Sequence, residues 1–143
     1  MINYLREQTK FNFGGRRACT KWIKSVILEE SFECPKSVGD ISIVFCSDKY
    51  LLQINRQFLS HDYFTDVITF DNSEDNVISG DIFISVDSVR SNAELYKQDF
   101  MNELHRVIIH GILHMLGYKD RTKEQKKVMR EREDFYLNKK LSS

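Results

Sequence analysis

The side chains with the clearest chemical potential are His110, His114 and Asp120, which follow one another closely in the sequence. Two histidines four residues apart on a helix are separated by about 400°, so both project from one face, about one turn apart. Gly117 is a suitable place for this helix to end, because glycine adopts the left-handed conformation at little steric cost. The chain would then turn back and bring Asp120 towards the two imidazole rings.

Two imidazole nitrogens and one carboxylate oxygen suit zinc and leave a fourth position for water, which is the pattern of a catalytic zinc site. Bound Zn²⁺ lowers the pKa of that water from about 15.7 to about 7, producing a hydroxide nucleophile at neutral pH. The spacing therefore predicts one zinc ion per chain, held by His110, His114 and Asp120. The alternative is a helix with two incidental histidines, and the offsets of Gly117 and Asp120 favour the metal site.

The spacing of these ligands and the glycine resembles that of two protein families. Metzincin-type metalloproteases share it, but zinc proteases of this kind need a glutamate directly after the first histidine as general base. This chain has Gly111 there. The YbeY family of bacterial zinc endoribonucleases has that glycine, in the signature His-Gly-x-Leu-His-Leu-x-Gly-Tyr-Asp-His, and it also matches Leu113, Gly117 and Tyr118. The motif therefore resembles YbeY.

Other parts of the chain resemble YbeY blocks in the family's order: Ile54-Asn55 with Asp62 and Thr65–Phe70, then Gly80–Ser85, then Met129 with Glu133. The resemblance implies a zinc-dependent endoribonuclease specific for single-stranded RNA. It implies action in rRNA maturation, at the 3′ end of 16S rRNA, and in ribosome quality control. The implied partners are single-stranded RNA or rRNA and the small ribosomal subunit, and no DNA.

The chain departs from the family pattern at two positions. Asp120 stands where the third ligand is usually histidine; a carboxylate is an acceptable zinc ligand, although its charge makes the metal a weaker Lewis acid. Leu59 stands where many members have an arginine that meets substrate phosphate. Leucine cannot pair with a phosphate, so we expect slow cleavage, and faster cleavage after Leu59→Arg, unless a neighbouring group compensates.

The sequence does not identify which side chains other than the metal ligands take part in catalysis. Arg56, His61, Asp66 and Asp81 are candidates for catalysis, and Gly80 and Ser85 are candidates for substrate contact; the 2′-hydroxyl of RNA could equally act as nucleophile. A rival hypothesis is a ribosome-associated assembly factor whose metal is mainly structural, which Leu59 favours. A metzincin-like zinc protease comes third, because of Gly111.

Composition is consistent with a single small cytoplasmic domain spanning residues 1–143. Hydrophobic residues make up 41% of the 143 residues, and no apolar run approaches the ~18 residues of a membrane span. No apolar signal segment begins the chain, so we expect no membrane association. The three cysteines are widely spaced, which predicts small apolar residues without disulfides. Net charge is zero, but lysine and arginine are absent from residues 57–89 and gather towards both ends. There they could form a phosphate-attracting rim, or they could simply be the solvated faces of the first and last helices.

The hydrophobic periodicity predicts an α+β domain with a mixed sheet of about four strands packed with helices. We expect strands at residues 2–5, 41–45, 67–70 and 82–86, and helices at 17–30, after Ser47, at 87–96, at 99–116 and at 122–139. Thr122 and Gln125 form a possible capping box for the last helix. The sheet should pack on one face of the central helix, and the opposite face, which carries the histidines, should line a cleft. The metal should lie at the C-terminal end of that helix. His105 lies about 140° around the helix from His110, so we do not expect it to bind the metal.

Overall fold

Four strands form one mixed sheet with the order β1-β2-β4-β3: β1 (Ile2–Glu7), β2 (Ser37–Cys46), β3 (Val67–Asp71) and β4 (Val77–Ser85). The structure, a computed structural model, describes residues 1–32 and 34–142, without the side chains of residues 141 and 142. β2 runs parallel to both β1 and β4, whereas β3 runs antiparallel to β4. The predicted mixed sheet is confirmed. β4 begins earlier than expected, because Val77 and Ile78 already pair with the start of β2.

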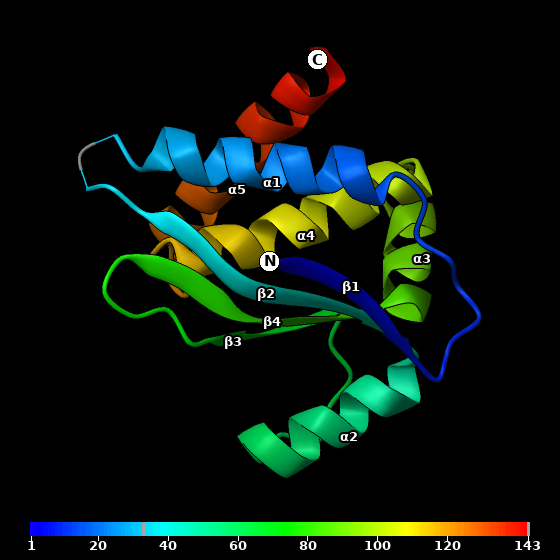
Figure 1. Cartoon of the computed structure of the whole chain (residues 1–143). Coiled ribbons are helices and arrows are strands. Elements are labelled where there is room, and N and C mark those ends of the chain that lie inside the picture. Colours follow the sequence, from blue (N-terminus) through cyan, green and yellow to red (C-terminus); the bar gives the residue numbers. More distant parts are fainter. Residues whose placement is uncertain (33, 143) are drawn as a thin grey trace.

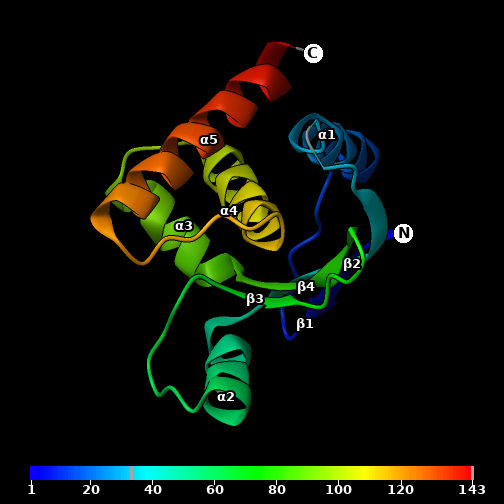
Figure 2. The same ribbon diagram turned by 90° about the vertical axis from the view of Figure 1, so that its left-hand side faces the viewer.

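The five expected helices are all present: α1 (Arg16–Glu30), α2 (Asp48–Leu59), α3 (Val86–Leu95), α4 (Phe100–Met115) and α5 (Lys123–Ser142). Ser47 caps α2 by accepting a hydrogen bond from the backbone N–H of Tyr50, and Thr122 and Gln125 form the reciprocal capping box of α5. Figures 1 and 2 show α1, α3, α4 and α5 on one side of the sheet and α2 alone on the other. No helix in the described part of the chain is long and apolar enough to cross a membrane.

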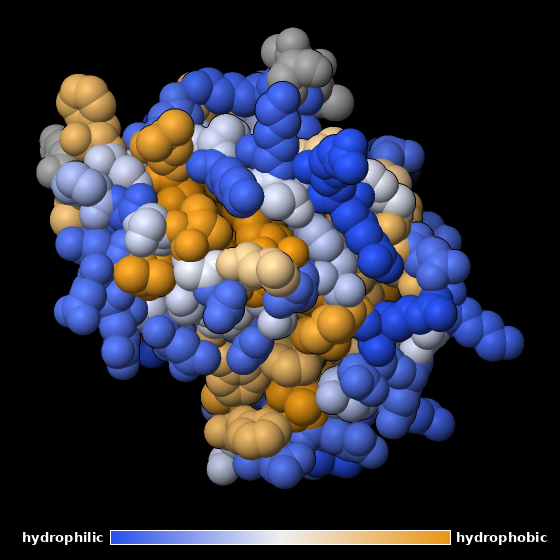
Figure 3. Space-filling model, viewed as in Figure 1, coloured by the Kyte–Doolittle hydropathy of each residue, from blue (hydrophilic) through white to orange (hydrophobic). Residues whose placement is uncertain are grey.

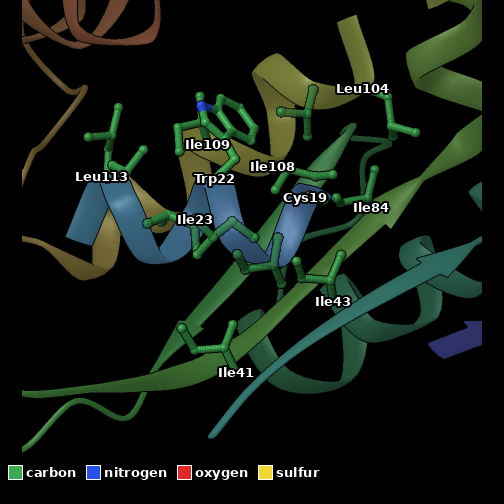
Figure 4. Packing of buried hydrophobic residues seen from close by; sticks show 14 of the residues in the cluster. Cys19, Trp22, Ile23, Ile41, Ile43, Ile84, Leu104, Ile108, Ile109 and Leu113 are labelled. Atoms are coloured by element: carbon green, nitrogen blue, oxygen red, sulfur yellow. The ribbon is translucent and has the colours of Figure 1, made fainter. Parts of the chain in front are cut away.

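The main core lies between the sheet and the helix pair α1 and α4 (Figure 4). Alternate residues of the inner strands, such as Ile41, Ile43 and Ile84, are fully buried there, and each such side chain stabilises the fold by roughly 1.5–3 kcal/mol. α4 approaches β4 closely at Gly111, where an added Cβ would lie 2.7 Å from Ile82 Cδ1. Since Gly111 faces the sheet, the neighbouring His110 is turned away from it, as predicted.

A smaller cluster holds α2 against the opposite face of the sheet, and it consists of Cys46, Leu51, Ile54 and Ile68. On the face of the molecule shown in Figure 3, polar side chains cover the upper right, and apolar ones form patches over the left-hand part of α1, across the middle and towards α2 at the bottom. The end of α2 leaves Phe58 and Leu59 exposed.

All three cysteines are free thiols, as expected. Cys19 and Cys46 are buried and serve as small apolar residues. Cys34 is exposed, so that expectation is wrong for this cysteine, which follows α1 in the connection to β2 rather than lying within a packed element.

Candidate metal centre

The last turn of α4 ends at Gly117, which has φ 106°. The N–H of Gly117 donates to the carbonyl of His114 (3.0 Å), and the N–H of Tyr118 donates to that of Leu113 (3.0 Å). These two bonds form a Schellman motif, which uses the left-handed glycine to stop a helix and reverse the chain. The predicted helix end is confirmed, and the reversed chain carries Asp120 back to the histidine face.

Three donor atoms converge at this end of α4. His110 Nε2 and His114 Nε2 lie 3.1 Å apart, and Asp120 Oδ2 lies 3.3 Å from the first and 3.5 Å from the second. Ligands about 2.0–2.2 Å from a tetrahedral zinc ion stand roughly 3.3–3.6 Å from one another. Two of the three separations fall in this range and the His110–His114 separation is slightly shorter, so the donor set can hold a metal ion such as zinc. Among the described residues, this is the single group of three or more His, Cys, Asp or Glu side chains with such spacing.

Glu133 of α5 fixes the orientation of the first histidine. Its Oε2 lies 2.7 Å from His110 Nδ1, and its Oε1 accepts a hydrogen bond of 2.9 Å from Arg106. With Nδ1–H donating to this carboxylate, the lone pair of Nε2 faces Asp120 and His114, as metal ligation requires. The sequence resemblance included Glu133 without giving it a role. Only the packing of α5 on α4 shows that it contacts His110.

The two histidines differ in their electrostatic surroundings. Burial lowers the pKa of His110, but the hydrogen bond and charge of Glu133, aided by Asp120 and Asp66, outweigh burial and raise that pKa overall. Burial also lowers the pKa of His114, and the charge of His110 lowers it further, with partial compensation by Asp120. The arrangement thus surrounds the histidine pair with carboxylates, which suits a bound cation.

Glu30, at the end of α1, anchors the chain segment that leads to Asp120. Its Oε1 accepts a hydrogen bond of 2.7 Å from the hydroxyl of Tyr118, and its Oε2 accepts one from Tyr136 of α5. Arg132 lies 3.5 Å from the same carboxylate. These contacts join α1, the segment after Gly117 and α5 at a point two residues before Asp120.

The donor atoms open into a cleft of about 720 Å³ bounded by α3, α4, α5 and β3. Of the candidates for catalysis, the cleft is lined by Asp66 alone. This half-buried carboxyl has a raised pKa, caused mainly by burial and partly offset by backbone hydrogen bonds and by His110. Basic residues of the last helix, Lys126 and Arg130, also line the cleft, whereas none of those near the N-terminus does.

The candidates on or just after α2 lie outside this cleft. Arg56 forms an exposed ion pair with Asp62, and the ring of His61 stacks on Tyr63 with 5.1 Å between centroids. Leu59 is 40% exposed at the end of the same helix. Because α2 covers the other face of the sheet, none of these side chains is brought to the histidine pair.

The candidates in β4 also point elsewhere. Ile82 faces α4, so the alternation of a strand directs Asp81 to the opposite face, which it shares with Phe83. Gly80 is buried where an added Cβ would overlap the carbonyl oxygen of Phe70, so it permits close approach of β3. Ser85 caps α3 by accepting from the N–H of Ser88 and donates to Asp48. Gly80 and Ser85 therefore have structural roles, and their contact with substrate stays a prediction.

His105 packs as expected of a histidine that does not bind metal. Its ring makes edge contacts with Trp22 (5.8 Å) and Phe13 (6.0 Å). Burial, together with the charge of Lys140, lowers its pKa to about 4. Trp22 is buried in the core and donates from its indole nitrogen to the backbone carbonyl of Tyr136.

The fold and the site define a small α+β protein with a candidate metal centre in an open cleft. A protein-family model described as Endoribonuclease YbeY matches residues 3–140. The protein named Endoribonuclease YbeY from Cytophaga hutchinsonii is 46% identical to this chain over 138 residues, which cover 96% of this chain and 94% of the relative. The protein of the same name from Phocaeicola vulgatus is 49% identical over 129 residues, which cover 90% of this chain and 91% of the relative. A solution structure from Thermotoga maritima aligns with TM-score 0.69 at 27% identity, covering 99% of this chain and 90% of that one. The chain belongs to the YbeY family.

Proposed function

We propose that this protein is a zinc-dependent endoribonuclease that cleaves single-stranded RNA. The observation that supports the proposal most is the convergence of His110, His114 and Asp120 at zinc-site spacing in an open cleft, in a chain whose relatives are named endoribonucleases. We further propose that it acts in the cytoplasm on the small ribosomal subunit, in maturation of the 3′ end of 16S rRNA and in ribosome quality control.

The cleft provides distinct chemical roles for its side chains. His110, His114 and Asp120 would hold one Zn²⁺, which when bound polarises a phosphodiester oxygen and makes bound water more acidic. Glu133 keeps His110 in the tautomer that leaves Nε2 free. Asp66 is the remaining candidate to accept a proton from the nucleophile, either water or the 2′-hydroxyl, because burial makes its carboxylate a stronger base than an exposed one.

Two alternatives receive less support from the geometry. In a zinc protease the residue after the first histidine is the general base, but Gly111 faces Ile82 of the sheet, so a side chain there would enter the core. Structural zinc sites are closed by four protein ligands, whereas only three donors converge here among residues 1–32 and 34–142. A ribosome-associated assembly factor with a mainly structural metal is therefore the less favoured hypothesis.

One experiment separates these functions. Zinc-loaded protein is incubated with an unstructured RNA, a DNA of the same sequence and casein, and its zinc content is measured by elemental analysis. We expect metal-dependent cleavage of RNA alone, and loss of both zinc and cleavage in His114→Ala. Undiminished cleavage by His114→Ala would remove the metal site from the reaction. Intact RNA together with binding to small ribosomal subunits would favour the assembly factor.

The assignment of Asp120 has its own test. If its carboxylate is the third ligand, Asp120→Ala weakens zinc binding strongly, whereas Asp120→His retains it by providing the ligand usual in the family. Competition with a chelator gives both dissociation constants. Equal constants for the wild type and Asp120→Ala would exclude Asp120 as a ligand.

A further inference from the structure

The side chains that line the metal cleft include more carboxylates than cations, which disfavours the binding of RNA. Five carboxylates and three cations line it: Asp66, Asp71, Glu103, Asp120 and Glu133, with Arg106, Lys126 and Arg130. Arg106 is already engaged, since its guanidinium bonds Glu133 (2.9 Å) and Asp134 (2.6 Å). A polyanionic strand that enters this cleft therefore needs the remaining cations in addition to any metal charge.

Those cations, Lys126 and Arg130, stand four residues apart on α5 and so share one face of the helix. Both side chains are exposed, and neither makes a hydrogen bond or ion pair with any residue that the structure describes. Met129, between them, is buried and also lines the cleft, which fixes this part of α5 against the domain. Both cations thus border the cleft free of hydrogen bonds and ion pairs to the described residues, and the charge of Arg130 acts on the neighbouring carboxyl of Glu103, where it partly offsets the rise in pKa that burial causes.

The α3 side of the same cleft provides an exposed aromatic ring. Tyr96, the residue that ends α3, lines the cleft and is 61% exposed. An exposed aromatic ring forgoes the stabilisation that its burial would give the fold. It instead presents a flat face on which another ring can stack. Stacking on such rings is how many proteins hold the bases of single-stranded nucleic acids.

We propose that the cleft contains a nucleotide subsite beside the metal centre, in which Lys126 and Arg130 bind a phosphate and Tyr96 stacks on a base. This subsite supplies a phosphate contact within the cleft, whereas position 59 lies outside it. The inference rests on the proposed RNA-cleaving function, because it names the groups that hold that substrate. It also explains how RNA is retained although the residues near α2 lie outside the cleft.

Substitutions with matched controls test the subsite in zinc-loaded protein. Arg130→Gln is compared with Lys127→Gln, which removes the same charge from an exposed position of α5 that does not line the cleft. Tyr96→Leu is compared with Phe32→Leu, which removes a 94% exposed ring outside the cleft. Binding of a fluorescent 2′-O-methyl oligouridylate is measured by anisotropy over a range of salt concentrations, and a denaturing gel verifies that the oligonucleotide stays intact. Cleavage of unmodified RNA is measured in parallel.

We expect Arg130→Gln to weaken binding about fivefold at 0.1 M salt and to reduce the slope of log affinity against log salt by about 0.7, the value for one lost contact to single-stranded phosphate. Tyr96→Leu should weaken binding about fivefold or more without changing that slope. Both controls should bind as the wild type does, and zinc content should stay constant. Equal affinities for Arg130→Gln and Lys127→Gln, or for Tyr96→Leu and Phe32→Leu, would overturn the subsite. A wild type that binds through these groups but cleaves no RNA would contradict the proposed function and support the subsite.

Discussion

Replacing Glu133 by glutamine should weaken zinc binding much more than the loss of a remote charge would. Glu133 uses both oxygens, one for Arg106 and one for His110 Nδ1–H, and it is only 5% exposed. An amide has a single acceptor oxygen, so one of these two donors must face an NH₂ group instead. If the oxygen stays with the charged Arg106, His110 must accept at Nδ1, and its proton then moves to Nε2, where it blocks ligation.

The expected loss is about 10- to 100-fold in zinc affinity, the effect of removing a partner that orients a ligating histidine. That corresponds to about 1.4–2.7 kcal/mol. The stabilisation that saturating zinc gives the fold should fall by a similar amount, because metal binding and folding are linked. For a chain of this size, the rise in Tm caused by zinc should shrink by roughly 3–10 °C.

Competition with a chelator gives the zinc dissociation constant, and thermal unfolding with and without zinc gives the linked change in Tm. Comparing the two Tm values of one variant removes any effect of the altered Arg106 contact on the fold itself. Asp134→Asn is the matched control, because Asp134 also bonds Arg106 but does not contact His110. Unchanged affinity in Glu133→Gln, or an equal loss in Asp134→Asn, would refute the role assigned to Glu133.

Three other perturbations have defined outcomes. Leu59→Arg should raise the single-turnover rate of RNA cleavage by less than about tenfold, because Leu59 lies outside the cleft; a larger gain would mean that its loop reaches the substrate. The pKa of His105 is about 4 in the fold against 6.5 in an unfolded chain. Its contribution should therefore lower the free energy of unfolding by up to about 1 kcal/mol between pH 7.5 and 5.5, after allowance for solvent screening. The unfolded state therefore binds the proton first as pH falls, and His105→Gln should flatten that part of the profile in urea titrations. Gly111→Ala should destabilise the fold by about 1–3 kcal/mol, because its Cβ would press on Ile82, and added Ile82→Val should restore part of the loss.

The parts of the site that the sequence predicted correctly depend on local geometry. The positive φ of Gly117 and the capping box of Thr122 and Gln125 involve residues only a few positions apart, so their spacing alone specifies them. The positions of His110 and His114 on one helix face follow from helical periodicity in the same way.

The parts that the sequence did not predict depend on packing between distant elements. Arg56 and His61 were plausible candidates until α2 was found on the opposite face of the sheet. Asp81 was excluded from the cleft by strand register, since Ile82 is the residue that faces α4. The contact of Glu133 with His110 joins two helices across 23 residues. No local pattern specifies how α5 crosses α4, so that contact had to be observed.

The position of Glu133 and Tyr136 on the last helix also bears on the timing of metal acquisition during synthesis. A nascent chain contains His110, His114 and Asp120 before α5 has been made. Until α5 docks, His110 lacks the carboxylate of Glu133, which selects its tautomer. Glu30, which binds Tyr118, also lacks its second hydrogen bond, the one from Tyr136. If His110, His114 and Asp120 hold zinc as proposed, a product that stops before α5 should contain the three ligands but bind zinc weakly. Tight metal binding would then require that α5 has been synthesised and has docked against α4.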